Sequence, residues 1–185
     1  MGVQASMEDQ VILVDRDDRE IGVDGKLAAH QSGKLHRAFS IFLFDAQGRV
    51  LLQRRAFEKY HSGGLWSNTC CSHPRPGEDA NVAARRRLIE EMGIDCDVEH
   101  KFDYFYRCEF PNGLVEHEYV YVFFGRYEGE PTPNPAEVGD WKWMDLGDLR
   151  ADVRTNPSSY SFWLATCLDE VVRHYADDQA YKKQA

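Results

Sequence analysis

The chain has 185 residues, enough for one domain with a buried core, and no apolar run approaches the roughly 20 residues needed to span a bilayer. Hydrophobic residues make up 43% and charged residues 29%, as in ordinary globular proteins. The net charge of −9 argues against nucleic acid or an anionic membrane as the main partner.

Strand signals dominate the first third of the chain. The polar residues 1–10 are predicted to form a flexible N-terminus, followed by a single domain over residues 11–180. The apolar run 11–15 reads as a short strand. Residues 39–44 and 50–53 flank Asp-Ala-Gln-Gly, and together they predict a β-hairpin.

The remaining segments mix helices and strands. Residues 79–92 contain no Pro or Gly and precede Gly93, which predicts a helix that ends there. Two alternating runs, 97–110 and 114–125, flank Pro-Asn-Gly and predict a second β-hairpin. A short strand is expected at 141–145, and an amphipathic helix at 160–176 closes the chain. These elements predict a mixed α/β (α+β) domain, with a sheet packed between helices.

Paired charges mark the predicted helix at 79–92. Arg86 and Glu90, like Arg87 and Glu91, stand four residues apart and share a helix face. Taken alone, this spacing is typical of intrahelical ion pairs on a solvated surface.

The same segment resembles the Nudix box, a loop–helix–loop that holds divalent metal on a diphosphate substrate. The matching positions are Glu78, Arg86, Leu88, Glu90, Glu91, Gly93 and Ile94. Two positions depart from the box, because Ser72 replaces its first Gly and Arg87 replaces the first Glu after the Arg. That Glu helps hydrolases hold the metals that activate water. A cation there weakens the hydrolase interpretation and suits direct pairing with a diphosphate.

Adjacent cysteines precede the box in Trp-Ser-Asn-Thr-Cys-Cys-Ser-His-Pro, residues 66–74. In an extended segment Cys70 and Cys71 point to opposite faces, so only one can line a pocket. Free cysteines are often just small buried hydrophobes. The segment, however, resembles the signature of isopentenyl-diphosphate isomerases of the metal-dependent Nudix type, which implies that Cys71 is catalytic. Five cysteines, an odd number, favour a reducing cytoplasm.

Three histidines and two glutamates could form a metal site. His30, His36 and His73 are expected in loops or at strand ends, while Glu116 and Glu118 share one face of a strand. A Glu-x-Glu pair on a strand usually lies on a solvent-exposed face. The whole set of three imidazoles and two carboxylates, however, suits one divalent ion that prefers octahedral coordination. The family resemblance implies Mn²⁺, Mg²⁺ or Zn²⁺ here. His117, between the glutamates, should face away.

The second hairpin allows a prediction of register. If Pro-Asn-Gly is a three-residue loop with Gly113 at positive φ, residues that sum to 224 face each other. Tyr106 then lies opposite Glu118, and Cys108 opposite Glu116. A two-residue turn would send Tyr106 to the other face. The resemblance implies a catalytic tyrosine at Tyr106 and so favours the longer loop, although an aromatic there could simply pack.

The resemblance implies a complete set of roles for moving a double bond by adding one proton and removing another. Cys71 and Glu118 form the acid–base pair, and because the reaction is reversible the sequence does not decide which of them is the acid in the forward direction. Tyr106 relays or orients the proton, and Trp163 offers its π face to the tertiary carbocation. The diphosphate clamp consists of Lys26, Arg55, Lys59 and Arg87. A second ion, Mg²⁺ brought with the diphosphate, is held by Glu91 and the Cys71 main-chain carbonyl.

We therefore predict a Nudix-fold isomerase that interconverts isopentenyl and dimethylallyl diphosphate. The expected partner is this small isoprenoid diphosphate, with no nucleic acid or membrane, and the chain is expected to be a monomer or weak dimer. One alternative is a Nudix hydrolase of a nucleoside or isoprenoid diphosphate. Another is an inert module that binds metal or diphosphate.

Overall fold

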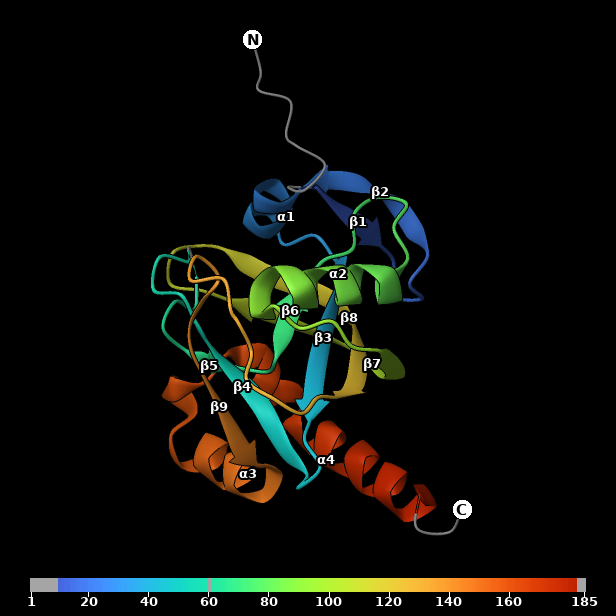
Figure 1. Cartoon of the computed structure of the whole chain (residues 1–185). Helices are drawn as coiled ribbons and strands as arrows, with labels where there is room; N and C mark the ends of the chain where they lie inside the picture. The colour runs from blue at the N-terminus through green and yellow to red at the C-terminus, as the bar shows by residue number, and fades with distance from the viewer. Residues whose placement is uncertain (1–9, 60, 183–185) are drawn as a thin grey trace.

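The computed structural model describes residues 10–59 and 61–182 as one mixed β-sheet with helices on both faces (Figure 1). The strands are β1 (Gln10–Val14), β2 (Glu20–Gly25), β3 (His36–Phe44), β4 (Arg49–Arg55), β5 (Trp66–Ser67), β6 (Cys70–Ser72), β7 (Val98–Glu109), β8 (Val115–Arg126) and β9 (Val138–Asp145). The helices are α1 (Lys26–Ser32), α2 (Ala80–Met92), α3 (Leu146–Thr155) and α4 (Phe162–Lys182), with a 3-10 turn, η2, at Pro157–Ser159. None of these helices is long and apolar enough to cross a membrane.

Strand β3 pairs with four other strands of the sheet. It pairs in parallel with β8 along its whole length, from His36 beside Glu118 to Phe44 beside Arg126. It also pairs antiparallel with β1, β4 and β6, while β7 adds to β8 and β9 adds to β4. The parallel pairing sets His36 directly next to Glu118, although 82 positions separate them in the sequence.

Residues on the two faces of β3 pack into two separate hydrophobic cores. Phe39, Ile41 and Leu43 pack with the buried face of α2. Phe42 and Phe44 point to the opposite side, where they pack with α3 and α4. Helix α2 crosses one side of the sheet and α4 lies on the other (Figure 1). The predicted arrangement of a sheet between helices is confirmed, and it explains why β3 is apolar on both faces.

Helix α2 begins at a side-chain cap, Asp79, and ends at a glycine, Gly93. Asp79 caps its start by accepting hydrogen bonds from the backbone N–H of Asn81 at 2.9 Å and Val82 at 3.2 Å. Gly93 ends it with φ of 67°, and a Cβ at that position would lie 2.5 Å from the carbonyl oxygen of Thr132. The predicted helix is confirmed to within one residue.

Several boundaries differ from the sequence-based expectation. Strand β1 begins at Gln10, inside the segment predicted to be flexible, and the rest of that segment lies outside the described residues. Helix α4 runs from Phe162 to Lys182 rather than over 160–176. The prediction that His30 lies in a loop or strand end is wrong, because His30 sits in α1. This helix has seven residues, too few to show a helical period.

Candidate active site and metal centre

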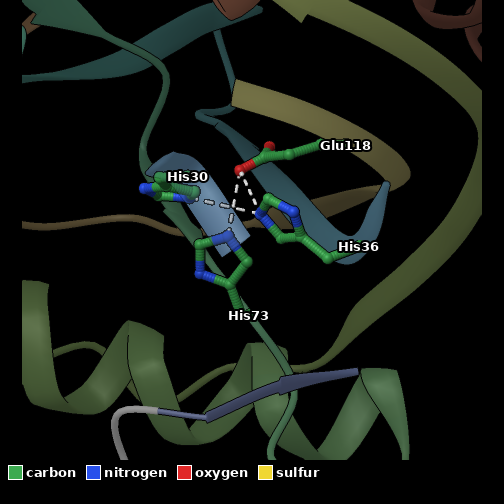
Figure 2. Close-up of side chains that lie close together, drawn as sticks. All are labelled: His30, His36, His73 and Glu118. Atoms are coloured by element: carbon green, nitrogen blue, oxygen red, sulfur yellow. Dashed lines mark hydrogen bonds and ion pairs between the residues drawn. The ribbon is translucent and has the colours of Figure 1, made fainter. Parts of the chain in front are cut away.

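Four of the five predicted metal ligands converge on one point. His30 comes from α1, His36 from the start of β3, His73 from the segment after β6, and Glu118 from β8 (Figure 2). One ligand atom from each lies within 4.8 Å of all the others. The Nε2 atoms of His30 and His36 are 3.2 Å apart, and His73 Nε2 is 2.9 Å from Glu118 Oε1.

The protonation of this cluster suits a cation. His36 Nδ1 lies 2.8 Å from the Lys34 carbonyl oxygen and can donate to it, which turns Nε2 toward the cluster. Burial lowers the pKa of both His30 and His73 to about 3, which leaves their rings neutral. Burial alone would raise the pKa of Glu118, but hydrogen bonds with His36 and His73 hold it well below its usual range. Three imidazoles and a carboxylate whose ligand atoms converge therefore fit a divalent metal ion.

Glu116, the fifth predicted ligand, lies beside this cluster rather than inside it. The Tyr106 hydroxyl donates to Glu116 Oε2 at 2.7 Å and lies 3.0 Å from Glu118 Oε2, which ties the two carboxylates together. Burial and the nearby Glu118 charge raise the pKa of Glu116 to about 8. A cation near the pair would offset this repulsion and favour the ionised form of Glu116.

The hairpin register places these groups as predicted. Tyr106 is the partner of Glu118, and Cys108 is the partner of Glu116. Gly113 has φ of 81°, so the longer loop is confirmed. His117 faces the other side of β8, where its Nδ1 lies 3.1 Å from the Gly33 carbonyl oxygen.

The two adjacent cysteines have different environments. Cys70 is fully buried in the core under α2, whereas Cys71 faces the cavity that Tyr106, Glu118 and Trp163 also line. The Cys71 thiol donates to Asn68 Oδ1 at 2.9 Å. Burial raises the pKa of Cys71 to about 12, so the thiol keeps its proton at neutral pH.

Trp163 forms an aromatic wall of this cavity. Its side chain is buried, and its Nε1 donates to Ser67 Oγ at 2.8 Å, which fixes the ring. The Arg55 guanidinium carbon lies 5.1 Å from the ring centroid. The electron-rich π face that attracts Arg55 can also stabilise a positive charge that develops in the cavity.

A second, basic cavity of about 300 Å³ adjoins the first, and both include Lys26 and His73 in their linings. Its charged residues are Lys26, Lys59, Arg75, Arg86, Arg87, Glu90 and Glu137. All four predicted clamp cations therefore line one cavity or the other. A larger cavity, of about 460 Å³, lies beside Phe44 and Tyr175. No histidine or cysteine among the described residues lines it, so we place the site by its chemistry rather than by cavity size.

The cations and carboxylates of the basic cavity are already paired with one another. Arg87 donates to Glu91 Oε1 at 2.5 Å, and Gln53 donates to Glu91 Oε2 at 3.1 Å. Glu137 forms an ion pair with Lys59 and lies 3.5 Å from Arg87. An anionic group bound in this cavity would compete with Glu137 for Lys59 and with Glu91 for Arg87.

Several residues of the site were not among the predicted ones, and three of them contact predicted residues directly. Asn68 holds the Cys71 thiol, Glu137 pairs with the clamp cations, and His61 contacts Glu116. Asn68 falls within the segment that suggested the catalytic cysteine, so its position beside Cys71 was the available signal. His61 and Glu137 lie in irregular segments with no periodicity, and nothing in their spacing links them to the site.

Acidification is expected to destabilise the metal-free protein. Burial lowers the pKa of His30, His61 and His73 to about 3, so the unfolded chain takes up these protons first as the pH falls below about 6.5. The raised pKa of Glu116 acts in the opposite direction but involves one group against three. Urea unfolding after chelator treatment should show a smaller free energy of unfolding at about pH 5 than at about pH 7. Equal values would contradict the buried, neutral state of these rings.

Comparisons with known proteins first define the class. Residues 34–164 match the NUDIX domain family. The crystal structure of DR0079 from Deinococcus radiodurans superimposes with a TM-score of 0.74 at 19% identity, over 87% of this chain and 98% of that one. A MutT NUDIX hydrolase from Burkholderia pseudomallei gives a TM-score of 0.59 at 21% identity, over 74% and 98% of the two chains. The chain thus has the Nudix fold.

Sequence relatives then define the family. Isopentenyl-diphosphate Delta-isomerase 2 of Aromatoleum aromaticum is 62% identical over 90% of this chain and 88% of its own. The isopentenyl-diphosphate Delta-isomerase of Burkholderia multivorans is 53% identical over 88% and 93%. The chain belongs to the isopentenyl-diphosphate Delta-isomerase family. The predictions of fold and family are confirmed, whereas the roles of individual residues stay predictions.

Proposed function

We propose that this chain interconverts isopentenyl and dimethylallyl diphosphate, with Cys71 and Glu118 as its acid–base pair. The observation that carries the proposal is the cavity in which a protonated thiol, an ionised carboxylate and a tryptophan ring meet. One group can give a proton and the other can accept one, as transposition of a double bond requires.

The reaction adds a proton to the terminal alkene carbon and removes one from the methylene next to the resulting tertiary carbocation. The electron pair of the broken C–H bond forms the new double bond, so atoms and charge balance. The buried walls of the cavity exclude water, which would otherwise capture the cation. The π face of Trp163 stabilises the carbocation by about 1–2 kcal/mol. The Tyr106 hydroxyl, which contacts both carboxylates, relays or orients the proton on Glu118.

The residues present fit two divalent ions. His30, His36, His73 and Glu118, with Glu116 beside them, would hold Mn²⁺, Mg²⁺ or Zn²⁺. Glu91 and the Cys71 main-chain carbonyl would hold a Mg²⁺ that arrives with the diphosphate. When bound, such ions supply positive charge that offsets the buried carboxylates and the diphosphate.

The direct test is incubation of the purified protein with isopentenyl diphosphate and Mg²⁺ in D₂O, followed by NMR. Dimethylallyl diphosphate that carries deuterium is the expected product. Release of phosphate or pyrophosphate would instead support a hydrolase, against which Arg87 in the box argues. Unchanged substrate in the presence of a metal-loaded protein would favour an inert binding module.

Lys59→Met is expected to raise KM for isopentenyl diphosphate by about 10–100-fold, because it removes one charge-assisted hydrogen bond of about 1.5–3 kcal/mol. The kcat should change little, because Lys59 lines the basic cavity and not the cavity of Cys71 and Glu118. Steady-state kinetics with Lys101→Met as a matched control would check this, since Lys101 pairs with Glu99 and Asp178 on β7 and α4. A fall in kcat at unchanged KM would place Lys59 in the chemical step.

We further propose that the protein acts as a monomer or weak dimer, because the groups that the proposed reaction needs, Cys71, Tyr106, Glu118 and Trp163, line one cavity within a single chain. All five cysteines are free, which suits a reducing compartment such as the cytoplasm. Size-exclusion chromatography with light scattering would test the oligomeric state.

A further inference from the structure

His61 contacts the candidate metal centre from an irregular loop. Its Nε2 lies 3.1 Å from Glu116 Oε1, and its side chain is only 6% exposed. The opposite oxygen of the same carboxylate, Oε2, accepts the Tyr106 hydroxyl. The Glu116 carboxylate is thus held from both sides, by a tyrosine on β7 and by His61 from the loop between β4 and β5.

Packing fixes the His61 ring in this position. It stacks on Phe110 with ring centroids 4.9 Å apart and an interplanar angle of 18°, and it meets Trp163 edge-on at 6.0 Å. It also lines the cavity that holds Cys71 and Glu118. A ring confined between two aromatic neighbours loses little further freedom when it makes a hydrogen bond, so the contact with Glu116 is preorganised.

The contacts at its two ring nitrogens make His61 a donor. The Ser62 hydroxyl lies 3.5 Å from Nδ1 and can donate to it, which would leave the proton on Nε2. The Nε2–H then points at a carboxylate that needs a donor once it is ionised.

We propose that His61 is a positioning residue that holds Glu116 for the metal ion, as a hydrogen-bond donor outside the ligand set. This inference rests on the proposed metal site at His30, His36, His73, Glu116 and Glu118. Partners that hydrogen-bond a metal-binding carboxylate orient it, and their loss typically costs 10–100-fold in metal affinity.

The same loop connects the metal centre to the diphosphate clamp. The Arg55 guanidinium lies 3.4 Å from the His61 carbonyl oxygen while it also faces the Trp163 ring. One residue therefore contacts a metal-ligand candidate through its side chain and a clamp cation through its backbone. Substitution of the His61 side chain should therefore lower the affinity for the metal ion, and it should change KM for the diphosphate much less.

Four variants separate hydrogen bonding from packing. His61→Phe keeps a ring between Phe110 and Trp163 but removes the donor, and His61→Ala removes both. His61→Gln places an amide N–H near the position of Nε2, whereas the shorter side chain of His61→Asn does not reach Glu116. Competition with a fluorescent chelator would give the Kd for Mn²⁺ of each variant, and thermal unfolding would check its fold.

We expect the Kd for Mn²⁺ to rise about 10–100-fold in His61→Phe, His61→Ala and His61→Asn, and to stay within about threefold of the original protein in His61→Gln. Wild-type affinity in a folded His61→Phe would overturn the proposal, as would equal losses in the Gln and Phe variants. His36→Ala and His73→Ala, each of which removes a ligand nitrogen of the cluster, test the underlying site in the same assay. If they also bind Mn²⁺ normally, the metal site itself is wrong, and this outcome differs from a failure of His61 alone.

Discussion

Cys71→Ala is expected to lower kcat by about 10²–10⁴-fold while the protein stays folded. In the proposed mechanism the thiol is a proton-transfer group, and general acid–base groups contribute about 10²–10⁴-fold. A water held by Ser40, Ser67 and Asn68 in the vacated space would be too weak an acid to replace the thiol. The thiol is small and only partly buried, so the cost in stability should be about 1 kcal/mol.

The measurement is kcat under saturating isopentenyl diphosphate and Mg²⁺, with urea unfolding on the same sample. Cys96→Ala is the matched control, since Cys96 is also a partly buried free thiol but packs in the other core, near α2. It should retain full activity. Activity of Cys71→Ala within tenfold of the original would remove the thiol from the mechanism and leave Glu118 and Tyr106 as the remaining proton-transfer groups.

Local chemistry made several features of the site predictable. Alternation along an extended strand placed Cys70 and Cys71 on opposite faces, and the structure has one in the core and one in the cavity. Turn geometry at Gly113 set the register that joins Tyr106 to Glu118. Each of these inferences depends on neighbours within about 20 residues, where backbone geometry fixes the outcome.

Long-range contacts could not be predicted from such local patterns without the family resemblance. The parallel pairing of β3 with β8 brings His36 to Glu118, but parallel strands leave no turn signal in the sequence. His30 was misplaced because α1 is too short to show a period. Glu137 and His61 reach the site from irregular segments, so their partners depend on how the loops pack against the finished sheet.

Glu118→Gln is expected to reduce kcat by at least about 10³-fold, and excess metal should not restore it. Glu118 has two separate tasks in the proposed mechanism. Its Oε1 faces His36 and His73 as a metal ligand, while its Oε2 lies by the Tyr106 hydroxyl as a proton-transfer group. Glutamine keeps a ligand oxygen of similar geometry but can neither accept nor release the proton at neutral pH.

Comparison with a residue that serves only the metal separates these tasks. His73→Gln should weaken Mn²⁺ binding, but kcat should largely recover at saturating Mn²⁺, whereas Glu118→Gln should stay inactive under the same conditions. Glu109→Gln controls for the loss of a carboxylate from the hairpin, because Glu109 pairs with Arg107 on the surface. If saturating Mn²⁺ also restored Glu118→Gln, the carboxylate would be a ligand alone. The proton would then have to pass through Tyr106 to Glu116, the other carboxylate that its hydroxyl contacts.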